Sequence, residues 1–134
     1  MTPEEFTELY ESAARLERAG AYTYARDAFL VVGDAAEERG RMDDAREARR
    51  RAMQNHVTAW ARQRWPREEI HIHDVLFSEW PFGTFGRRRS RVDLQICVRP
   101  YPSQVGYGYA TTRAHVTVGR RGDVRLEHDV RKQR

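Results

Sequence analysis

Four of the five histidines in this 134-residue sequence fall in segments that alternate between apolar and polar residues. His71 and His73 are two positions apart, so both fall on one face of an extended strand, together with Glu69. A further ligand from a neighbouring strand, either His115 or His128, would complete the three or four ligands that a zinc ion requires.

The residues between these histidines favour a simpler interpretation. Ile70 and Ile72 alternate with His71 and His73, as expected for a strand that buries one face and exposes the other. We therefore predict no metal site and no cofactor.

Covalent catalysis has little support in the sequence. Cys97 is the only cysteine, and it falls in mid-strand on the face opposite the apolar residues, with no base whose position can be inferred. The sequence contains no G-x-S-x-G motif, no H-E-x-x-H motif and no phosphate-binding loop. We predict that the protein is not an enzyme.

Arginine and aromatic residues gather in and beside the segment 78–89. Guanidinium groups there could pair with phosphates while aromatic rings stack on bases. The residues expected to contact nucleic acid are Phe85, Arg87, Arg88, Arg89, Arg91, Arg120 and Arg121. No RNP signature, helix-turn-helix or zinc finger accompanies them.

The charge of the chain is unevenly distributed. Residues 1–48 carry 12 acidic and 6 basic side chains, a net charge of −6, whereas residues 49–134 carry 8 acidic and 18 basic side chains, a net charge of +10. The basic half could bind an acidic partner, most often nucleic acid, or the two halves could attract each other or a second copy.

Composition limits the class of protein. One cysteine excludes an intramolecular disulfide, the acidic amphipathic N-terminus is unlike a signal peptide, and no apolar run approaches the roughly 20 residues that span a bilayer. We expect a cytoplasmic protein without a membrane segment.

Two helices are expected at the start of the chain. Thr2 can cap a helix that begins at Pro3, and Gly20 ends it, since glycine accepts the left-handed conformation there. A second helix is expected from about 22 to 38, followed by the same stop at Gly40.

The hydrophobic period changes after Pro66, which limits a third helix that is expected to begin near a cap at Asp43 and to run to Trp65. Strands are expected at 69–77, 91–99, 107–118 and 123–129, with a hairpin turn at 119–122, loops at 78–89 and 100–106, and a frayed tail at 131–134. The predicted fold is α+β: three N-terminal helices over 1–66, then a four-stranded, mostly antiparallel sheet over 67–134 that packs on the helices as one compact unit.

The expected turn between the first two helices opens a recognisable spacing, Gly20-x-Tyr22-x-x-Ala25-x-x-x-Phe29-x-x-Val32, which continues into the second helix. Glycine allows a tight turn, the small alanine lets two helices approach, and the aromatics fill the remaining space, as in the tetratricopeptide hairpin. The spacing partly recurs at Gly40-x-Met42-x-x-Ala45, 20 residues on, which indicates three successive helices with similar turns rather than a true repeat.

The run Leu16-Glu17-x-x-Gly20-x-Tyr22-x-x-Ala25-Arg26-x-x-Phe29-Leu30 resembles the core of the PerC/ANR group of small enterobacterial virulence regulators. The arginine-rich run 46–51 is similar to the end of that core, so the resemblance covers residues 6–53. It implies a regulator that acts through protein contacts with a transcription factor or at a promoter.

These observations favour a small non-enzymatic regulator or adaptor that binds a protein, such as a transcription regulator or a nucleoprotein complex of the kind that phages and plasmids carry, which it could inhibit. The alternative is direct binding of nucleic acid by the basic C-terminal half, and pairing of sheet edges could give a homodimer. The residues expected to bind a protein partner are Tyr22, Arg26, Phe29, Arg49 and Arg50.

Overall fold

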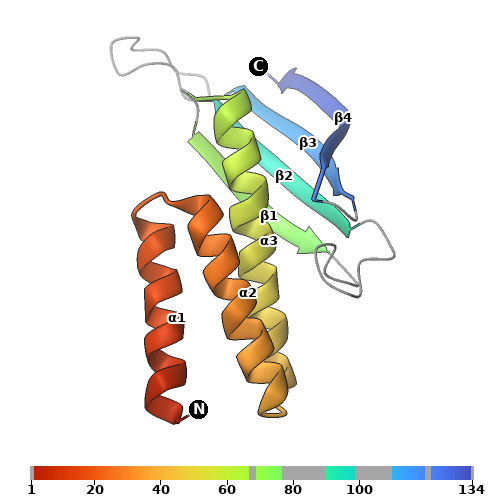
Figure 1. The fold of residues 1–134 in the computed structure, drawn as a ribbon. Helices are drawn as coiled ribbons and strands as arrows, with labels where there is room; N and C mark the ends of the chain where they lie inside the picture. The colour runs from red at the N-terminus through yellow and green to blue at the C-terminus, as the bar shows by residue number, and fades with distance from the viewer. Residues whose placement is uncertain (1, 67–68, 77–89, 99–109, 120–121, 134) are drawn as a thin grey trace. The chain divides into compact units, whose positions relative to one another are not determined.

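A computed structural model describes residues 2–66, 69–76, 90–98, 110–119 and 122–133. Three helices are followed by an antiparallel sheet, which is the order that the sequence predicts (Figure 1). The elements are α1 Pro3–Arg18, α2 Tyr22–Glu38, α3 Met42–Arg64, β1 Glu69–Leu76, β2 Ser90–Val98, β3 Ala110–Val118 and β4 Val124–Gln133. The chain divides into two compact units, 1–59 and 60–134, which we call the helical unit and the sheet unit.

Helix α1 begins where the sequence predicts. The hydroxyl of Thr2 accepts a hydrogen bond from the backbone N–H of Glu5 at 3.2 Å, and Pro3 occupies the first turn, where no intrahelical N–H is needed. Glu4 and Glu5 place negative charge at this end of the helix, which its dipole favours.

Both turns between helices have the same hydrogen bonds. Gly20 and Gly40 have φ values of 77° and 73°, as predicted. The N–H of Ala21 donates to the carbonyl of Leu16 and that of Arg41 donates to the carbonyl of Ala36, each at 2.9 Å. The glycine N–H groups donate to carbonyls three residues earlier, so each turn is a Schellman motif that ends one helix and begins the next two residues later.

The predicted cap of α3 at Asp43 is wrong. The helix begins at Met42, and the N–H of Ala45 donates to the carbonyl of Arg41 at 3.0 Å, so the helical hydrogen bonds begin before Asp43. The Schellman turn sets this start, and Asp43 instead adds negative charge to the first turn.

The core of the helical unit is built from small residues around one aromatic ring. Ala25 and Ala45, which follow the two turn glycines at the same spacing, are fully buried, and so is Phe29. Alanines let the helix axes approach closely, and Phe29 fills the space between them. The other buried apolar side chains here are Phe6, Ala13, Ala14, Val32, Ala35, Ala36, Ala48, Ala52, Met53 and Val57.

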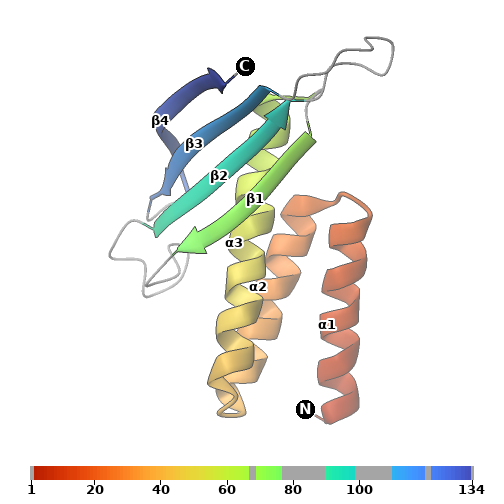
Figure 2. The same cartoon turned by 180° about the vertical axis from the view of Figure 1, so that it is seen from behind.

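The sheet has the order β1-β2-β3-β4 with every neighbouring pair antiparallel (Figure 2). The turn before β4 is closed by the N–H of Gly122 donating to Gly119 at 3.0 Å, and Gly122 has a φ of 83°. Strand β4 continues to Gln133, which pairs with Thr111, so the prediction of fraying from 131 is wrong for 131–133. Pairing in the ladder, rather than composition, keeps these residues in a strand.

The sheet departs in two ways from the strict alternation of buried and exposed residues that the sequence predicts for its strands. The register of β1 and β2 shifts between His71 and Asp74, where an irregularity changes which residues face the same way. In β3, Val116 and Val118 are fully buried, and Thr117 between them is only 8% exposed. Predicted strand ends at 77, 99 and 107–109 lie outside the described residues. No helix in the described part of the chain is long and apolar enough to cross a bilayer.

Candidate protein-binding surface on the helical unit

Three consecutive arginines on α3 point in three different directions, because successive helical residues are about 100° apart. Arg49 reaches α2, Arg51 reaches α1, and Arg50 lies 3.8 Å from Glu47 one turn away on its own helix. The run Arg49, Arg50 and Arg51 therefore does not form one basic patch, because each arginine has a different partner.

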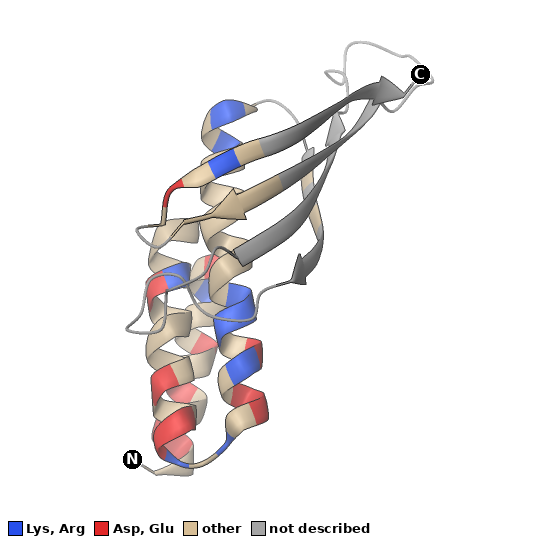
Figure 3. Cartoon of the chain, turned by 90° about the vertical axis from the view of Figure 1, so that its right-hand side faces the viewer, with Lys and Arg blue, Asp and Glu red and all other residues tan. Residues whose placement is uncertain are grey.

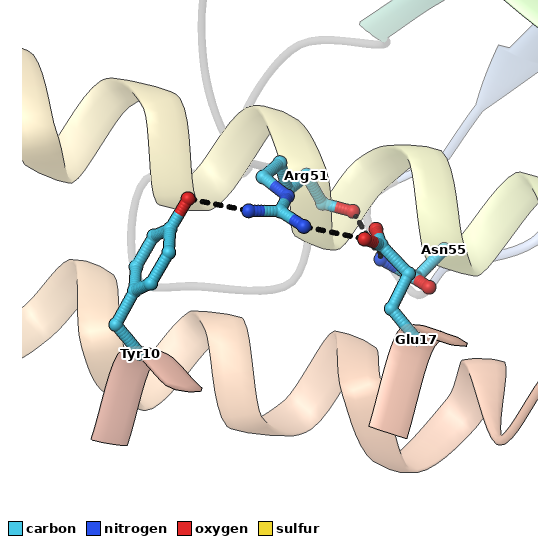
Figure 4. A network of polar contacts seen from close by, with 4 residues as sticks. All are labelled: Tyr10, Glu17, Arg51 and Asn55. Atoms are coloured by element: carbon cyan, nitrogen blue, oxygen red, sulfur yellow. Dashed lines mark hydrogen bonds and ion pairs between the residues drawn. The ribbon is translucent and has the colours of Figure 1, made fainter. Parts of the chain in front are cut away.

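Arg51 connects α3 to α1 through two polar partners (Figure 4). One guanidinium nitrogen donates to the hydroxyl of Tyr10, and the other donates to a carboxylate oxygen of Glu17. The side chains of Arg51 and Glu17 are only 21% and 28% exposed, so this ion pair is better protected from solvent than a surface pair.

Aromatic rings complete the surroundings of Arg51. The guanidinium carbon lies 4.4 Å from the centroid of the Phe29 ring and 5.3 Å from that of Tyr10, and the two rings meet edge to face at 6.0 Å. Burial alone would lower the pKa of Arg51, but the hydrogen bond and charge of Glu17 outweigh it, and the pKa is raised. The guanidinium is therefore charged and satisfied within the helical unit.

Asn55 extends this network by one helical turn. Its Nδ2 donates to Glu17 Oε1 and to the backbone carbonyl of Arg51, both at 2.8 Å. Asn55 is only 2% exposed, and its Oδ1 accepts no hydrogen bond from the described part of the chain. A buried amide with one unused acceptor costs stability, so its two retained hydrogen bonds, to Glu17 and to the Arg51 carbonyl, matter more.

Arg49 connects α3 to α2 through two carboxylates that are more exposed than Glu17. It donates to Asp34 at 3.1 Å and to Glu37 at 2.8 Å, and these carboxylates are 75% and 41% exposed. The aliphatic part of the Arg49 side chain, its stem, passes over Gly33, where an added Cβ would lie 3.1 Å from Arg49 Cγ. Burial would lower the pKa of Arg49, but the bonds to Glu37 and Asp34 raise it overall.

The residues predicted to bind a protein partner divide into different classes. Phe29 is fully buried, so it belongs to the core and offers a partner no surface. An aromatic residue in the apolar stripe of a helix is typical of such a core position. Tyr22 is half-buried at the start of α2. Arg26 contacts Asp27 at 2.8 Å and His56 Nδ1 at 3.0 Å, so it and Arg49 act inside the unit.

Most of the residues predicted to bind nucleic acid, namely Phe85, Arg87, Arg88, Arg89, Arg120 and Arg121, lie outside the described residues. Arg91 belongs to β2, opposite Leu76 on one side and Thr117 on the other. The register places His115 opposite His128, and His71 opposite Gln95. Among the described side chains, no three of the types His, Cys, Asp or Glu gather as a metal site.

Helix α2 exposes two large apolar side chains that the sequence analysis did not single out. Tyr24 is 72% exposed and Val31 is 52% exposed. They are seven residues apart, so they lie on one line along the helix. The seven-residue spacing is present in the sequence, but the buried apolar residues of α2 lie in the same segment. Only the exposed fractions of the side chains distinguish Tyr24 and Val31 from those core residues.

Acidic side chains dominate the first two helices. Residues 3–38 carry nine acidic and three basic side chains, a net charge of −6. Figure 3 shows the acidic segments distributed over the helices. Glu4, Glu8 and Glu11 are exposed at a spacing of four and three residues, which places them on one face of α1. The solvent-facing chemistry of these helices is apolar and acidic.

No protein-family model matches this sequence, and no characterised protein or solved structure resembles it closely enough to show a relationship.

Proposed function

We propose that this protein is a cytoplasmic, non-enzymatic regulator that acts by binding a protein through its helical unit, with α1 and α2 serving as a tetratricopeptide-like hairpin. The observation that carries the proposal is the exposure of Tyr24 and Val31 on a helix whose other face is already closed by its own core. Large apolar side chains left in water at helical spacing are typical of a protein interface.

The internal use of the arginines supports a protein partner for this unit. Arg49 and Arg51 are bonded to carboxylates of α1 and α2, so they do not offer a free basic surface to phosphates. A net charge of −6 over residues 3–38 opposes nucleic acid there. The resemblance to the PerC/ANR regulators agrees with a role in transcription and stays part of this proposal.

The test is capture of a partner from a nuclease-treated lysate with the tagged full-length chain, followed by mass spectrometry. We expect a stoichiometric protein that the double variant Tyr24→Ser/Val31→Ser captures less well. Met42→Ser is the matched control, because Met42 is a similarly exposed apolar residue at the start of a different helix. Recovery of no stoichiometric protein by the wild type would falsify the proposal.

A second candidate function, nucleic-acid binding by the basic residues 60–134, has one described feature in its favour. Arg64 lies 5.7 Å from the ring centroid of Trp60 and 5.2 Å from that of Trp65, which combines a cation with aromatic surfaces. Titration of the full chain with labelled DNA or RNA between about 50 and 200 mM salt decides it, since phosphate contacts give a steep salt dependence. Replacing Arg87, Arg88 and Arg89 with alanine should then flatten that slope.

A further inference from the structure

The exposed flank of the α1–α2 hairpin has a chemistry that defines its partner more closely. We propose that this flank, formed by Leu9, Leu16, Tyr24, Ala28 and Val31, binds a basic amphipathic helix. The inference rests on the proposed function and names the surface and the class of partner.

Helical geometry places this flank away from α3. Gly33 faces α3, because a Cβ there would meet the stem of Arg49. At about 100° per residue, Tyr24 and Val31 lie roughly 160–180° around α2 from Gly33. On α1, Leu9 and Leu16 lie about 100° around the helix from Tyr10 and Glu17, the side chains that reach Arg51 of α3, and are half-buried.

The apolar residues of the flank have matching spacings. Leu9 and Leu16 are seven residues apart on α1, and Tyr24 and Val31 are seven apart on α2. The two helices are antiparallel and pack on each other, so these two lines run side by side over about 10 Å, at 1.5 Å per residue (Figure 1). Two turns of a partner helix, with anchors at i, i+3, i+4 and i+7, have this length.

Charge selects among the proteins that could cover the flank. Glu5 of α1 and Glu38 of α2 are exposed acidic residues within about 40° of the apolar lines. A second copy that docked by the same flank would bring the like-charged Glu5 and Glu38 of the two copies together, which disfavours a symmetric dimer. A helix with basic residues beside its apolar stripe would satisfy both the apolar lines and the carboxylates.

The test uses a probe of defined chemistry with the full-length protein. The probe is a fluorescently labelled 18-residue helical peptide with leucine along one face and lysine on the other, and its control carries glutamate in place of lysine. We expect the lysine peptide to bind, binding to weaken between 50 and 200 mM salt, and the glutamate peptide not to bind. Tyr24→Ser/Val31→Ser should weaken binding by about tenfold or more, as expected for interface anchors, whereas Met42→Ser should change it less than about twofold.

Two results would overturn the proposed flank: equal binding of the lysine peptide to the double variant and to the wild type, or equal binding of both peptides. Circular dichroism of the variants confirms that they fold, which is expected because both substituted side chains are exposed. The lysate experiment separates this inference from the proposed function. A protein captured equally by the wild type and the double variant contradicts the flank alone, whereas no captured protein contradicts the proposed function.

Discussion

On the α1 side of α3, Arg51 lies against the Phe29 ring and pairs with a largely buried carboxylate. On the α2 side, two residues earlier, Arg49 pairs with two carboxylates that are more exposed than Glu17, at 75% and 41%. We call the Arg51 contact the inner contact, because its single carboxylate is largely buried and is shared with Asn55. We call the Arg49 contact the outer contact, because Arg49 has two more exposed carboxylates as partners. The two arginine side chains are similarly buried, at 18% and 21% exposed, so the exposure and the number of their carboxylate partners, not charge alone, decide what each arginine contributes.

The largest expected effect comes from the ring beneath Arg51. Phe29→Ala should lower the free energy of unfolding by about 3–5 kcal/mol, because it opens a cavity at a fully buried site and removes the surface on which Arg51 lies. Urea denaturation followed by circular dichroism at 222 nm measures it. Leu30→Ala, at a half-buried neighbouring position, should cost clearly less. Equal losses would show that Phe29 is not the centre of the core.

The two arginine contacts should respond differently to loss of a carboxylate. Glu17→Ala leaves both Arg51 and Asn55 without a shared acceptor and should cost about 1–3 kcal/mol, the cost of unsatisfied, partly buried donors. Glu37→Ala leaves Arg49 bonded to Asp34 and should cost less than about 1 kcal/mol. The same denaturation experiment compares them, and a larger loss for Glu37→Ala would contradict the distinction between inner and outer contacts.

The two turns, in contrast, should be equivalent. Gly20→Ala and Gly40→Ala should each cost about 1 kcal/mol, because both glycines have positive φ and no neighbour within 4 Å of an added Cβ. The penalty is therefore one of backbone conformation alone. Denaturation midpoints that differ widely between the two variants would show that one turn has a further role.

The smallest effect tests how tightly the outer contact packs. Gly33→Ala should change stability little in the wild type, since the gain in helix propensity of about 1 kcal/mol is offset by crowding of the Arg49 stem, whose far end is held by Asp34 and Glu37. In an Arg49→Ala background the same substitution should stabilise by up to about 1 kcal/mol. A double-mutant cycle measures the difference, and a stabilisation of equal size in both backgrounds would refute the crowding.

Local signals in the sequence were sufficient for much of the helical unit. The cap at Thr2 and the stops at Gly20 and Gly40 depend on backbone hydrogen bonds within a few residues, and the structure confirms them. The cap assigned to Asp43 failed because the preceding turn supplies the start of α3 and needs no side chain there. The extent of β4 was underestimated because pairing with a distant strand, not the residues themselves, sets its end.

The candidate surface was harder to predict. The sequence predicts that Phe29, Arg26 and Arg49 bind a partner, but the structure uses all three inside the helical unit. The exposure of Tyr24 and Val31 is not predicted, because an apolar residue in an amphipathic helix is ordinarily expected to be buried.

The sequence by itself determined where α1 and α2 begin and end and where the chain changes from helix to strand, since these depend on interactions between near neighbours. Only the tertiary structure decided which arginines of the run 49–51 reach another helix, which carboxylate each one meets, and which apolar residues remain in water. Those outcomes depend on residues about 12–41 positions apart in the chain being brought together, as Tyr10, Glu17 and Glu37 are with α3. No local pattern specifies such long-range contacts, because the same amphipathic spacing is compatible with several helix arrangements.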